Sequence, residues 1–189
     1  VGALGETPRI ESYGPWIAAG AFQINFNFYL DPLSAVMALV VTGVGLLIHI
    51  YAVGNMAGEV GYYRFFAYLN LFLFFMLTLV LAGNYLLLFV GWEGIRLCSY
   101  LLIGFYFRKN DAADAGKKAF IVTRIGDCGF LIALLLLYWT FDSLNFAQVL
   151  PGAAGLPVET EASGPLTLIC LLLLAGAEGK SAQVPLYVW

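Results

Sequence analysis

The sequence predicts an all-α integral membrane protein, a bundle of about five transmembrane helices of which the last is discontinuous. Of its 189 residues, 61% are hydrophobic and only 11% are charged, and the mean hydropathy is +0.86. A soluble domain has roughly 45–50% apolar and about 25% charged residues, so the bilayer is the expected solvent. Five stretches have the roughly 20 mostly apolar residues that a membrane helix requires, and glycines and a proline interrupt the fifth.

The composition also excludes several kinds of site. The basic residues form no patch with interleaved aromatics, so nucleic-acid binding is not expected. Cys98, Cys128 and Cys170 lie in separate apolar runs without CxxC spacing, and His49 is the only histidine. Iron–sulfur and haem sites need clustered cysteine or histidine ligands, so we expect the cysteines to be small buried hydrophobic side chains.

The first element is a polar and aromatic segment, residues 1–32. Its run FQINFNFYL alternates in the manner of a short strand or an interfacial hairpin. Pro32 suits the first turn of the span that follows, residues 33–53, because the missing N–H is not needed there. We expect residues 33–189 to form the transmembrane domain. The chain starts at Val1 without a methionine and stops at Trp189 inside an apolar run, so we expect it to be part of a longer protein.

The next three spans are predicted at residues 65–81, 86–107 and 119–139. Only Gly83, Asn84 and Tyr85 join the second span to the third, so these two must be antiparallel neighbours. The stretch 140–165 is rich in Gly, Pro and Ala and is predicted to be a loop with one short surface helix.

The fifth span is predicted at residues 166–189. Glycines and Pro185 weaken the helix around Glu178 and Lys180, and Ser181 is a candidate cap for a restarted half-helix. Broken helices in the middle of a membrane expose backbone dipoles and recur at ion-transport sites. The pattern therefore directs attention to Glu178 and Lys180.

The charges of the loops predict the orientation. One side holds Arg64, Arg108, Lys109, Lys117 and Lys118, and the other holds Arg9 as its one basic residue together with several acids. Cytoplasmic loops carry the excess of Lys and Arg. The loop from Arg108 to Lys118 is therefore expected to be cytoplasmic, and the amino-terminal segment to lie outside.

Six ionisable residues lie inside the apolar spans: Glu93, Arg96, Arg124, Asp127, Glu178 and Lys180. Each costs about 2.5–3.5 kcal/mol at the centre of a membrane helix, so each is expected to face a bundle interior, a partner or a hydrated path. Two interpretations stay open. The charges form static ion pairs that hold the bundle together, or they form a proton or ion relay, which we favour because buried pairs stabilise weakly compared with apolar packing.

Spacing suggests roles within this set. Arg124 and Asp127 are three residues apart on one helix face, so we expect them to pair along the helix and shape the local field. A carboxylate that approaches and leaves a buried Lys180 would change the proton affinity of the lysine, which is what a proton pump requires.

Three motifs carry a family resemblance: GWEGIRLCSYLLIGFY (91–106), KKAFIVTRIGDCGFLIAL (117–134) and GKSAQVPLYVW (179–189). Together with residues 26–56 they closely resemble subunit L, called subunit 5 in mitochondria, of the proton-pumping NADH:quinone oxidoreductases (respiratory complex I). The resemblance covers essentially the whole chain except residues 140–165. It implies an antiporter-like channel subunit in the membrane arm of the complex, located in the cell (inner) membrane.

The resemblance also implies site residues, partners and cofactors. Glu93 matches the family's intramembrane glutamate and Lys180 its lysine on the broken helix, while Arg124 and Asp127 fall in an NRxGD-like segment with Thr123 where Asn is usual. The implied partners are the other membrane-arm subunits, the lipid bilayer and protons. This chain is expected to hold no cofactor or metal, because NADH, FMN, the iron–sulfur clusters and quinone belong to other subunits.

One departure from the family pattern affects the charges near Glu93. The pattern reads GWEGVGLCSYLL, whereas this chain has Ile95 and Arg96. At i+3 on a helix, the guanidinium of Arg96 is within reach of Glu93. We expect Arg96 to hold the Glu93 carboxylate and to hinder it from exchanging partners with Lys180.

Two other classes of protein remain as alternatives. The large subunit of a multi-subunit sodium/proton antiporter shares the architecture and a glutamate–lysine pair, although the motif GWEG…LCSYLLIGF favours the oxidoreductase. A purely structural membrane subunit, with static ion pairs, is the second.

Overall fold

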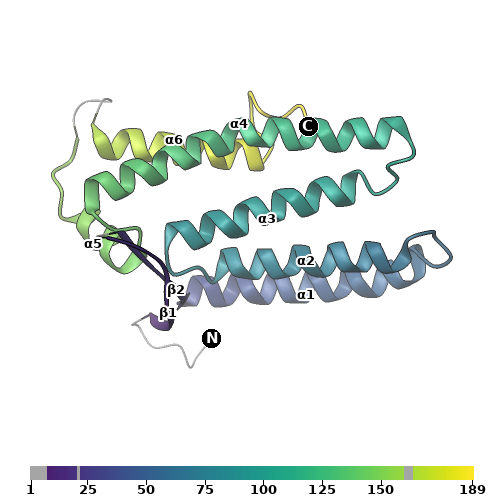
Figure 1. Cartoon of the computed structure of the whole chain (residues 1–189), viewed down its shortest axis with the longest axis horizontal. Helices are drawn as coiled ribbons and strands as arrows, with labels where there is room; N and C mark the ends of the chain where they lie inside the picture. The colour runs from purple at the N-terminus through teal and green to yellow at the C-terminus, as the bar shows by residue number, and fades with distance from the viewer. Residues whose placement is uncertain (1–7, 21, 160–163) are drawn as a thin grey trace.

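A computed structural model describes residues 8–20, 22–159 and 164–189 of the chain. Two strands, β1 (Arg9–Ala19) and β2 (Phe22–Leu30), precede six helices. The helices are α1 (Pro32–Asn55), α2 (Tyr62–Val80), α3 (Tyr85–Ile103), α4 (Asn110–Phe141), α5 (Phe146–Ala154) and α6 (Pro165–Lys180). Figure 1 shows α1 to α4 and α6 running side by side, with the hairpin and α5 gathered at one end.

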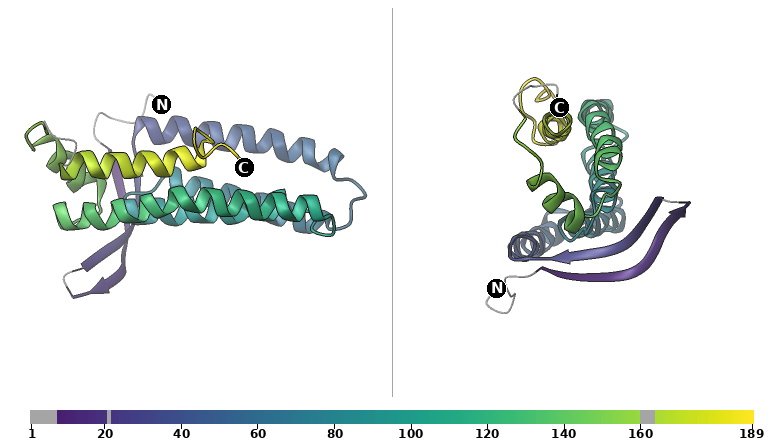
Figure 2. Two further views of the ribbon diagram at one scale, coloured as in Figure 1. Left: turned by 90° about the horizontal axis from the view of Figure 1, so that it is seen from above. Right: turned by 90° about the vertical axis from the view of Figure 1, so that its left-hand side faces the viewer.

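The strands form the hairpin that the alternating sequence predicts. They pair antiparallel from Arg9 opposite Leu30 to Ala19 opposite Phe22, with irregularities around Pro15. Pro15 lacks an N–H and so cannot donate to the ladder. The left view of Figure 2 shows the hairpin lying across the helices at their end and extending beyond the bundle.

The start of α1 is fixed by a capping box. The Asp31 carboxylate accepts from the Ser34 N–H at 2.7 Å, and the Ser34 hydroxyl accepts from the Asp31 N–H at 2.8 Å. Pro32 occupies the first turn of the helix, as predicted. Such reciprocal capping satisfies backbone donors that a helix start otherwise leaves unpaired.

A buried asparagine connects the hairpin to the turn between α2 and α3. The side chain of Asn84 is fully buried. Its amide donates to the Asn25 carbonyl at 3.0 Å and to the Asn27 side chain at 2.6 Å, while its oxygen accepts from the Leu87 N–H at 2.8 Å. The short connection therefore caps α3 and makes α2 and α3 antiparallel neighbours, as predicted.

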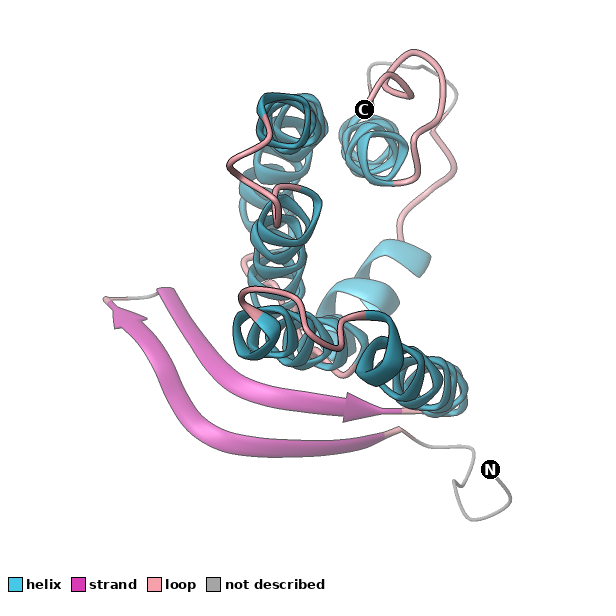
Figure 3. Ribbon diagram, turned by 90° about the vertical axis from the view of Figure 1, so that its right-hand side faces the viewer, coloured by secondary structure: helices cyan, strands magenta, loops and turns pink. Residues whose placement is uncertain are grey.

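Helices α4 and α6 meet through their backbones. A Cβ added to Gly126 would lie 2.9 Å from the Ala175 carbonyl oxygen and 3.1 Å from the Gly179 Cα. Only glycines allow this approach, which is the way small residues bring membrane helices together. Viewed end-on in Figure 3, the helices follow one another in a curved row. Helix α6 packs beside α4.

The apolar core lies at the hairpin end of the bundle. It contains residues from β2, α4, α5, α6 and the loop before α5: Ile24, Phe130, Leu134, Leu137, Leu144, Val149 and Ile169. The helix in the 140–165 stretch is thus α5, and Val149 anchors it to the core.

The structure is a bundle of apolar helices, as predicted, and contains four of the five predicted spans as helices of full length; α6, at the fifth predicted span, has 16 residues. Among the described residues, α1 to α4 are four helices that are long and apolar enough to cross a membrane. The connections from α1 to α2 and from α3 to α4 lie at one end of the bundle, and the hairpin and α5 lie at the other (Figure 1).

Several boundaries differ from the prediction. Helix α3 ends at Ile103, before the predicted 107, with Gly104 as its C-cap. Helix α4 already begins at Asn110, before the predicted 119, because polar residues continue a helix beyond its apolar part. Helix α6 has 16 residues and ends at Lys180, where the sequence predicts an interruption. The described residues 181–189 form turns, so Ser181 caps no restarted helix; its hydroxyl donates to the Ala177 carbonyl at 2.6 Å.

The cysteines follow the prediction only in part. Cys98 is buried in α3, as expected. Cys128 and Cys170 are exposed on the outer surface of the bundle. An apolar solvent makes this possible, since a membrane helix need not bury its small hydrophobic side chains inside the protein.

Candidate functional site

Helices α3, α4 and α6 bring five of the six predicted ionisable residues into one cluster. Helix α3 contributes Glu93 and Arg96, and α4 contributes Arg124 and Asp127. Lys180, the last residue of α6, reaches α3 through the Trp92 carbonyl. We call these five residues the charge cluster.

Two arginines hold Glu93. Its Oε1 accepts from Arg124 Nη1 at 2.5 Å, and its Oε2 forms an ion pair with Arg96 Nη2. The Arg124 side chain is 52% exposed, whereas that of Arg96 is only 5% exposed. The carboxylate therefore has one partner at the surface of the isolated chain and one in its interior.

Asp127 is the most deeply buried member of the charge cluster, with 2% of its side chain exposed. Its Oδ1 accepts a hydrogen bond of 2.6 Å from the indole Nε1 of Trp92. Its Oδ2 lies 3.3 Å from Arg96 Nη1, an ion pair without hydrogen-bond geometry. Arg96 thus stands between two carboxylates, Glu93 and Asp127.

Trp92 also contacts Lys180. The Lys180 ammonium donates to the Trp92 carbonyl oxygen at 3.2 Å, and its nitrogen lies 5.3 Å from the centre of the indole ring. A cation over an aromatic face is stabilised by about 0.5–2 kcal/mol. One tryptophan therefore contacts both the cation of α6 and the buried carboxylate of α4.

Arg96 lies beside a small, partly open cavity. Its guanidinium carbon is 4.4 Å from the centre of the Phe120 ring. The cavity has a volume of about 20 Å³ and is lined by Arg96, Tyr100, Phe120 and Lys180 among others. A space of this size holds about one water molecule, so it can connect Arg96 to Lys180 through a single water.

The expected pair of Arg124 and Asp127 is wrong. Each of the two residues instead contacts α3: Arg124 binds Glu93, and Asp127 binds Trp92 and Arg96. The i+3 spacing permits a pair along the helix, but the neighbouring helix offers partners of opposite charge. The predicted contact between Arg96 and Glu93 is present.

Glu178 does not join these contacts within the described part of the chain. It is half-buried, and its backbone carbonyl accepts from the Gln183 N–H at 3.1 Å. Sequence reasoning missed the double contact of Trp92 and the packing of Phe120 on Arg96. The position of Trp92 next to Glu93 was the available signal.

The charge cluster contains two carboxylates, those of Glu93 and Asp127, against three cations, those of Arg96, Arg124 and Lys180. Without Arg96 the two signs would balance. Within the described residues, no three His, Cys, Asp or Glu side chains gather closely enough to hold a metal ion.

Two family models match the chain. Residues 16–66 match "NADH-Ubiquinone oxidoreductase (complex I), chain 5 N-terminus", and residues 82–189 match "NADH:quinone oxidoreductase/Mrp antiporter, TM". The second model covers more than half of the chain, including the whole charge cluster.

Relatives named NADH-quinone oxidoreductase subunit L are similar over nearly the whole chain. The protein of Mycobacterium tuberculosis is 52% identical over 92% of this chain and 27% of its own length. The protein of Escherichia coli K12 is 49% identical over 99% of this chain and 30% of its own length. The chain thus spans less than a third of the length of these relatives.

Solved structures share the fold. A chain of the Mrp complex from Dietzia sp. DQ12-45-1b superposes with a TM-score of 0.77 and 27% identity, over 96% of this chain and 19% of that one. A chain of an archaeal membrane-bound sulfane sulfur reductase superposes with a TM-score of 0.70 at 23% identity, over 100% of this chain and 28% of that one. The latter likeness concerns the fold alone.

Proposed function

The chain belongs to the family of membrane subunits shared by NADH:quinone oxidoreductases and Mrp antiporters, and on this premise we propose that it forms part of a proton channel in a proton-pumping NADH:quinone oxidoreductase. Other subunits of the complex would oxidise NADH and reduce quinone, and would hold the FMN and iron–sulfur clusters. The observation that carries the proposal is the connected charge cluster across three apolar helices.

In this proposal Lys180 and Glu93 are the residues that take up and release protons. Lys180 has a flexible four-carbon side chain, so its ammonium can move between the Trp92 carbonyl and a nearby carboxylate. Trp92 holds Asp127 by its indole N–H and Lys180 by its carbonyl. Arg124 and Asp127 set the field around the relay, and Glu178 is a further charge on the same helix as Lys180.

Arg96 modifies this relay in the proposal. It occupies one oxygen of Glu93 and lies 3.3 Å from Asp127. A proton that reaches Glu93 must compete with two guanidinium groups for the carboxylate. Arg96 therefore slows proton loading at Glu93, and the single-water cavity beside it offers an alternative connection to Lys180.

We further propose the cell (inner) membrane as the location, with the amino-terminal segment outside and the loop from Arg108 to Lys118 in the cytoplasm. Partners are the other membrane-arm subunits. The distribution of basic residues supports this orientation, because they lie in or next to the α1–α2 and α3–α4 connections, at one end of the bundle.

Replacement of Lys180 by alanine in the complete subunit tests the proposal. The relay then loses its cation on α6, so NADH-driven proton uptake into membrane vesicles should fall at least tenfold while the complex still assembles. The matched control is Lys117→Ala, which removes an exposed lysine that pairs only with Asp114 in the described structure. Normal pumping by an assembled Lys180→Ala complex would support static ion pairs instead.

A sodium/proton antiporter subunit is the second candidate. The superposition on a chain of the Mrp complex favours it, since the TM-score is 0.77. The two functions separate in the same vesicles. A channel of the oxidoreductase translocates protons upon NADH addition without sodium, whereas an antiporter needs a sodium gradient and no NADH.

A further inference from the structure

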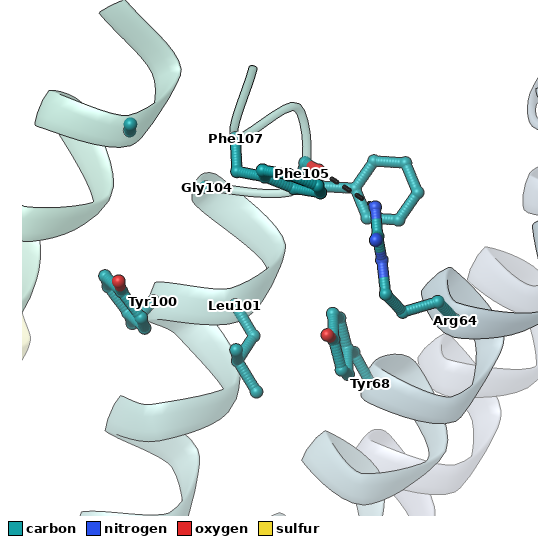
Figure 4. A pocket seen from close by; sticks show the side chains of 8 residues that line it. Arg64, Tyr68, Tyr100, Leu101, Gly104, Phe105 and Phe107 are labelled. Atoms are coloured by element: carbon teal, nitrogen blue, oxygen red, sulfur yellow. Dashed lines mark hydrogen bonds between the residues drawn. The ribbon is translucent and has the colours of Figure 1, made fainter. Parts of the chain in front are cut away.

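A basic and aromatic site lies at the opposite end of the bundle from the hairpin, where α2 begins and α3 ends. Figure 4 shows Arg64 of α2 pointing toward the end of α3, with Tyr68 below it and Leu101 on the facing helix. The site is far in sequence from Asp127 and Lys180, and it shares no residue with the charge cluster. Nothing in the proposed proton relay uses it.

Arg64 is held in place from two sides. Its Nη2 donates to the Phe105 carbonyl oxygen at 3.3 Å. Its guanidinium carbon lies 4.9 Å from the centre of the Phe105 ring and 5.0 Å from that of Phe107. A guanidinium has five N–H donors, so an arginine fixed in this way still has donors to offer a ligand.

Two cavities adjoin Arg64, and each has a volume of about 230 Å³. The first, which we call the slot, enters between α2 and α3 and is lined by Tyr68, Leu101 and Ala113 together with Arg64. The second opens toward the α3–α4 connection and is lined by Arg108 and Lys109, among others. Arg64 and the two phenylalanine rings line both cavities.

The charges around the second cavity favour an anion. Three basic residues, Arg64, Arg108 and Lys109, face one acid, Glu59. The surrounding surface is apolar and exposed, since Phe107 is 57% and Val60 is 88% exposed. This combination of bases beside apolar surface occurs at the end of a membrane span, where lipid headgroups begin.

We propose that this site binds an anionic phospholipid. The phosphodiester lies among Arg64, Arg108 and Lys109, and the glycerol and the first part of an acyl chain enter the slot between α2 and α3. A soluble phosphate would use the bases but leave the apolar slot unfilled. A zwitterionic lipid would fill the slot, but its cationic head would meet an excess of basic residues.

Photo-crosslinking in the complete complex tests the proposal. The complex is reconstituted in nanodiscs that contain phosphatidylglycerol with a diazirine in one acyl chain, and labelled peptides are mapped by mass spectrometry. Label is expected on the α2 and α3 residues that line the slot, such as Tyr68 and Leu101. The same diazirine in phosphatidylcholine should label them far less.

Two pairs of substitutions separate the site from general surface charge. Arg108→Gln with Lys109→Gln should weaken phosphatidylglycerol binding about 25-fold, since each base near a membrane surface contributes about 1 kcal/mol and 1.4 kcal/mol is a factor of ten. The matched control, Lys117→Gln with Lys118→Gln, removes the same charge from the first turns of α4, outside both cavities, and should leave labelling unchanged.

Ala113→Phe fills the slot without changing any charge, and should abolish the label even if the charge variants fail to assemble. Three results would overturn the proposal. They are equal labelling by the two lipids, loss of label in 10 mM inorganic phosphate, which would indicate a soluble anion, and absence of label from the slot, which would show that another part of the complex fills it.

Discussion

Replacement of Arg96 by glycine removes a buried cation from between two carboxylates. In the present chain both oxygens of Glu93 are bound, one to Arg96 and the other to Arg124. A hydrogen bond to a charged group contributes about 1.5–3 kcal/mol. Releasing Glu93 from Arg96 therefore adds about 2 kcal/mol to any step that requires the free carboxylate, which corresponds to a rate about 30-fold lower.

The substitution should not prevent folding. Arg96 Nε and Nη1 are buried without a hydrogen-bond partner among the described residues, so the guanidinium is incompletely satisfied where it lies. Each unsatisfied buried donor costs about 1–3 kcal/mol. Removing these unsatisfied donors therefore offsets part of the stability that is lost with the ion pairs of Arg96. Because glycine weakens a helix by about 1 kcal/mol relative to alanine, Arg96→Met, which keeps a long apolar stem, is the second version.

The assay is NADH-driven proton uptake in vesicles, with the complete subunit carrying Arg, Gly or Met at position 96 and with assembly checked on native gels. We expect both variants to raise the initial rate of uptake, by up to about 30-fold if proton loading at Glu93 limits pumping. Equal rates for all three complexes, at equal assembly and equal NADH oxidation, would refute the idea that Arg96 locks Glu93.

Three further predictions concern other parts of the chain. Ala112→Cys, in the first turn of α4 and on the side expected to be cytoplasmic, should react with a membrane-impermeant thiol reagent only in permeabilised cells, and labelling in intact cells would reverse the orientation. Trp92→Phe keeps an aromatic face for Lys180 but removes the N–H that binds Asp127 at 2.6 Å, so the subunit should lose about 2 kcal/mol of stability, seen as a lower melting temperature in scanning fluorimetry. Desolvation raises the pKa of Glu159, but hydrogen bonds from the start of α6 outweigh it and lower this pKa below its usual value. The ionised carboxyl therefore stabilises α6 above the unfolded pKa of about 4.3, and this stabilisation is lost as pH falls through the lowered value. The protection of the amides at the start of α6 against hydrogen exchange, measured relative to the intrinsic exchange rate at each pH, should therefore fall there in the wild type but stay constant in Glu159→Gln.

The order of the helices could be predicted because the bilayer leaves a strong signal in sequence. Spans, their connections and the cap at Pro32 follow from apolar length and local backbone rules. The predicted start of α4 was wrong for a physical reason. Hydropathy indicates how far a helix extends through an apolar solvent, but α4 continues beyond that part and begins in polar residues at Asn110. The interruption near Lys180 was foreseen from the glycines, but the predicted restart of the helix up to residue 189 was wrong, because the path of the chain after the interruption depends on contacts between helices.

The charge cluster was predictable as a set of residues and not as a set of pairs. A charge inside an apolar span is conspicuous in sequence, so Glu93, Asp127 and Lys180 could all be identified. Partners within one helix can be derived from spacing, and Arg96 with Glu93 is such a case. Partners on different helices depend on helix rotation, which no single-chain pattern reports, so Arg124 was assigned to Asp127 instead of Glu93.

The backbone contact between α4 and α6 affects the timescale of motion at Lys180. With 3.1 Å between the Gly179 Cα and the Cβ position of Gly126, the two helices have no side chains between them at this crossing, so sliding of one past the other is hindered there. Asp127 and the Cα of Lys180 therefore belong to one rigid unit formed by α4 and α6. The moving part is the lysine side chain, whose rotamer changes take picoseconds to nanoseconds when it is free to turn, whereas sliding of helices takes microseconds to milliseconds. We therefore expect exchange at Lys180 to be fast compared with enzyme turnover, and NMR relaxation of the lysine ammonium to report it as rapid side-chain motion on a static backbone.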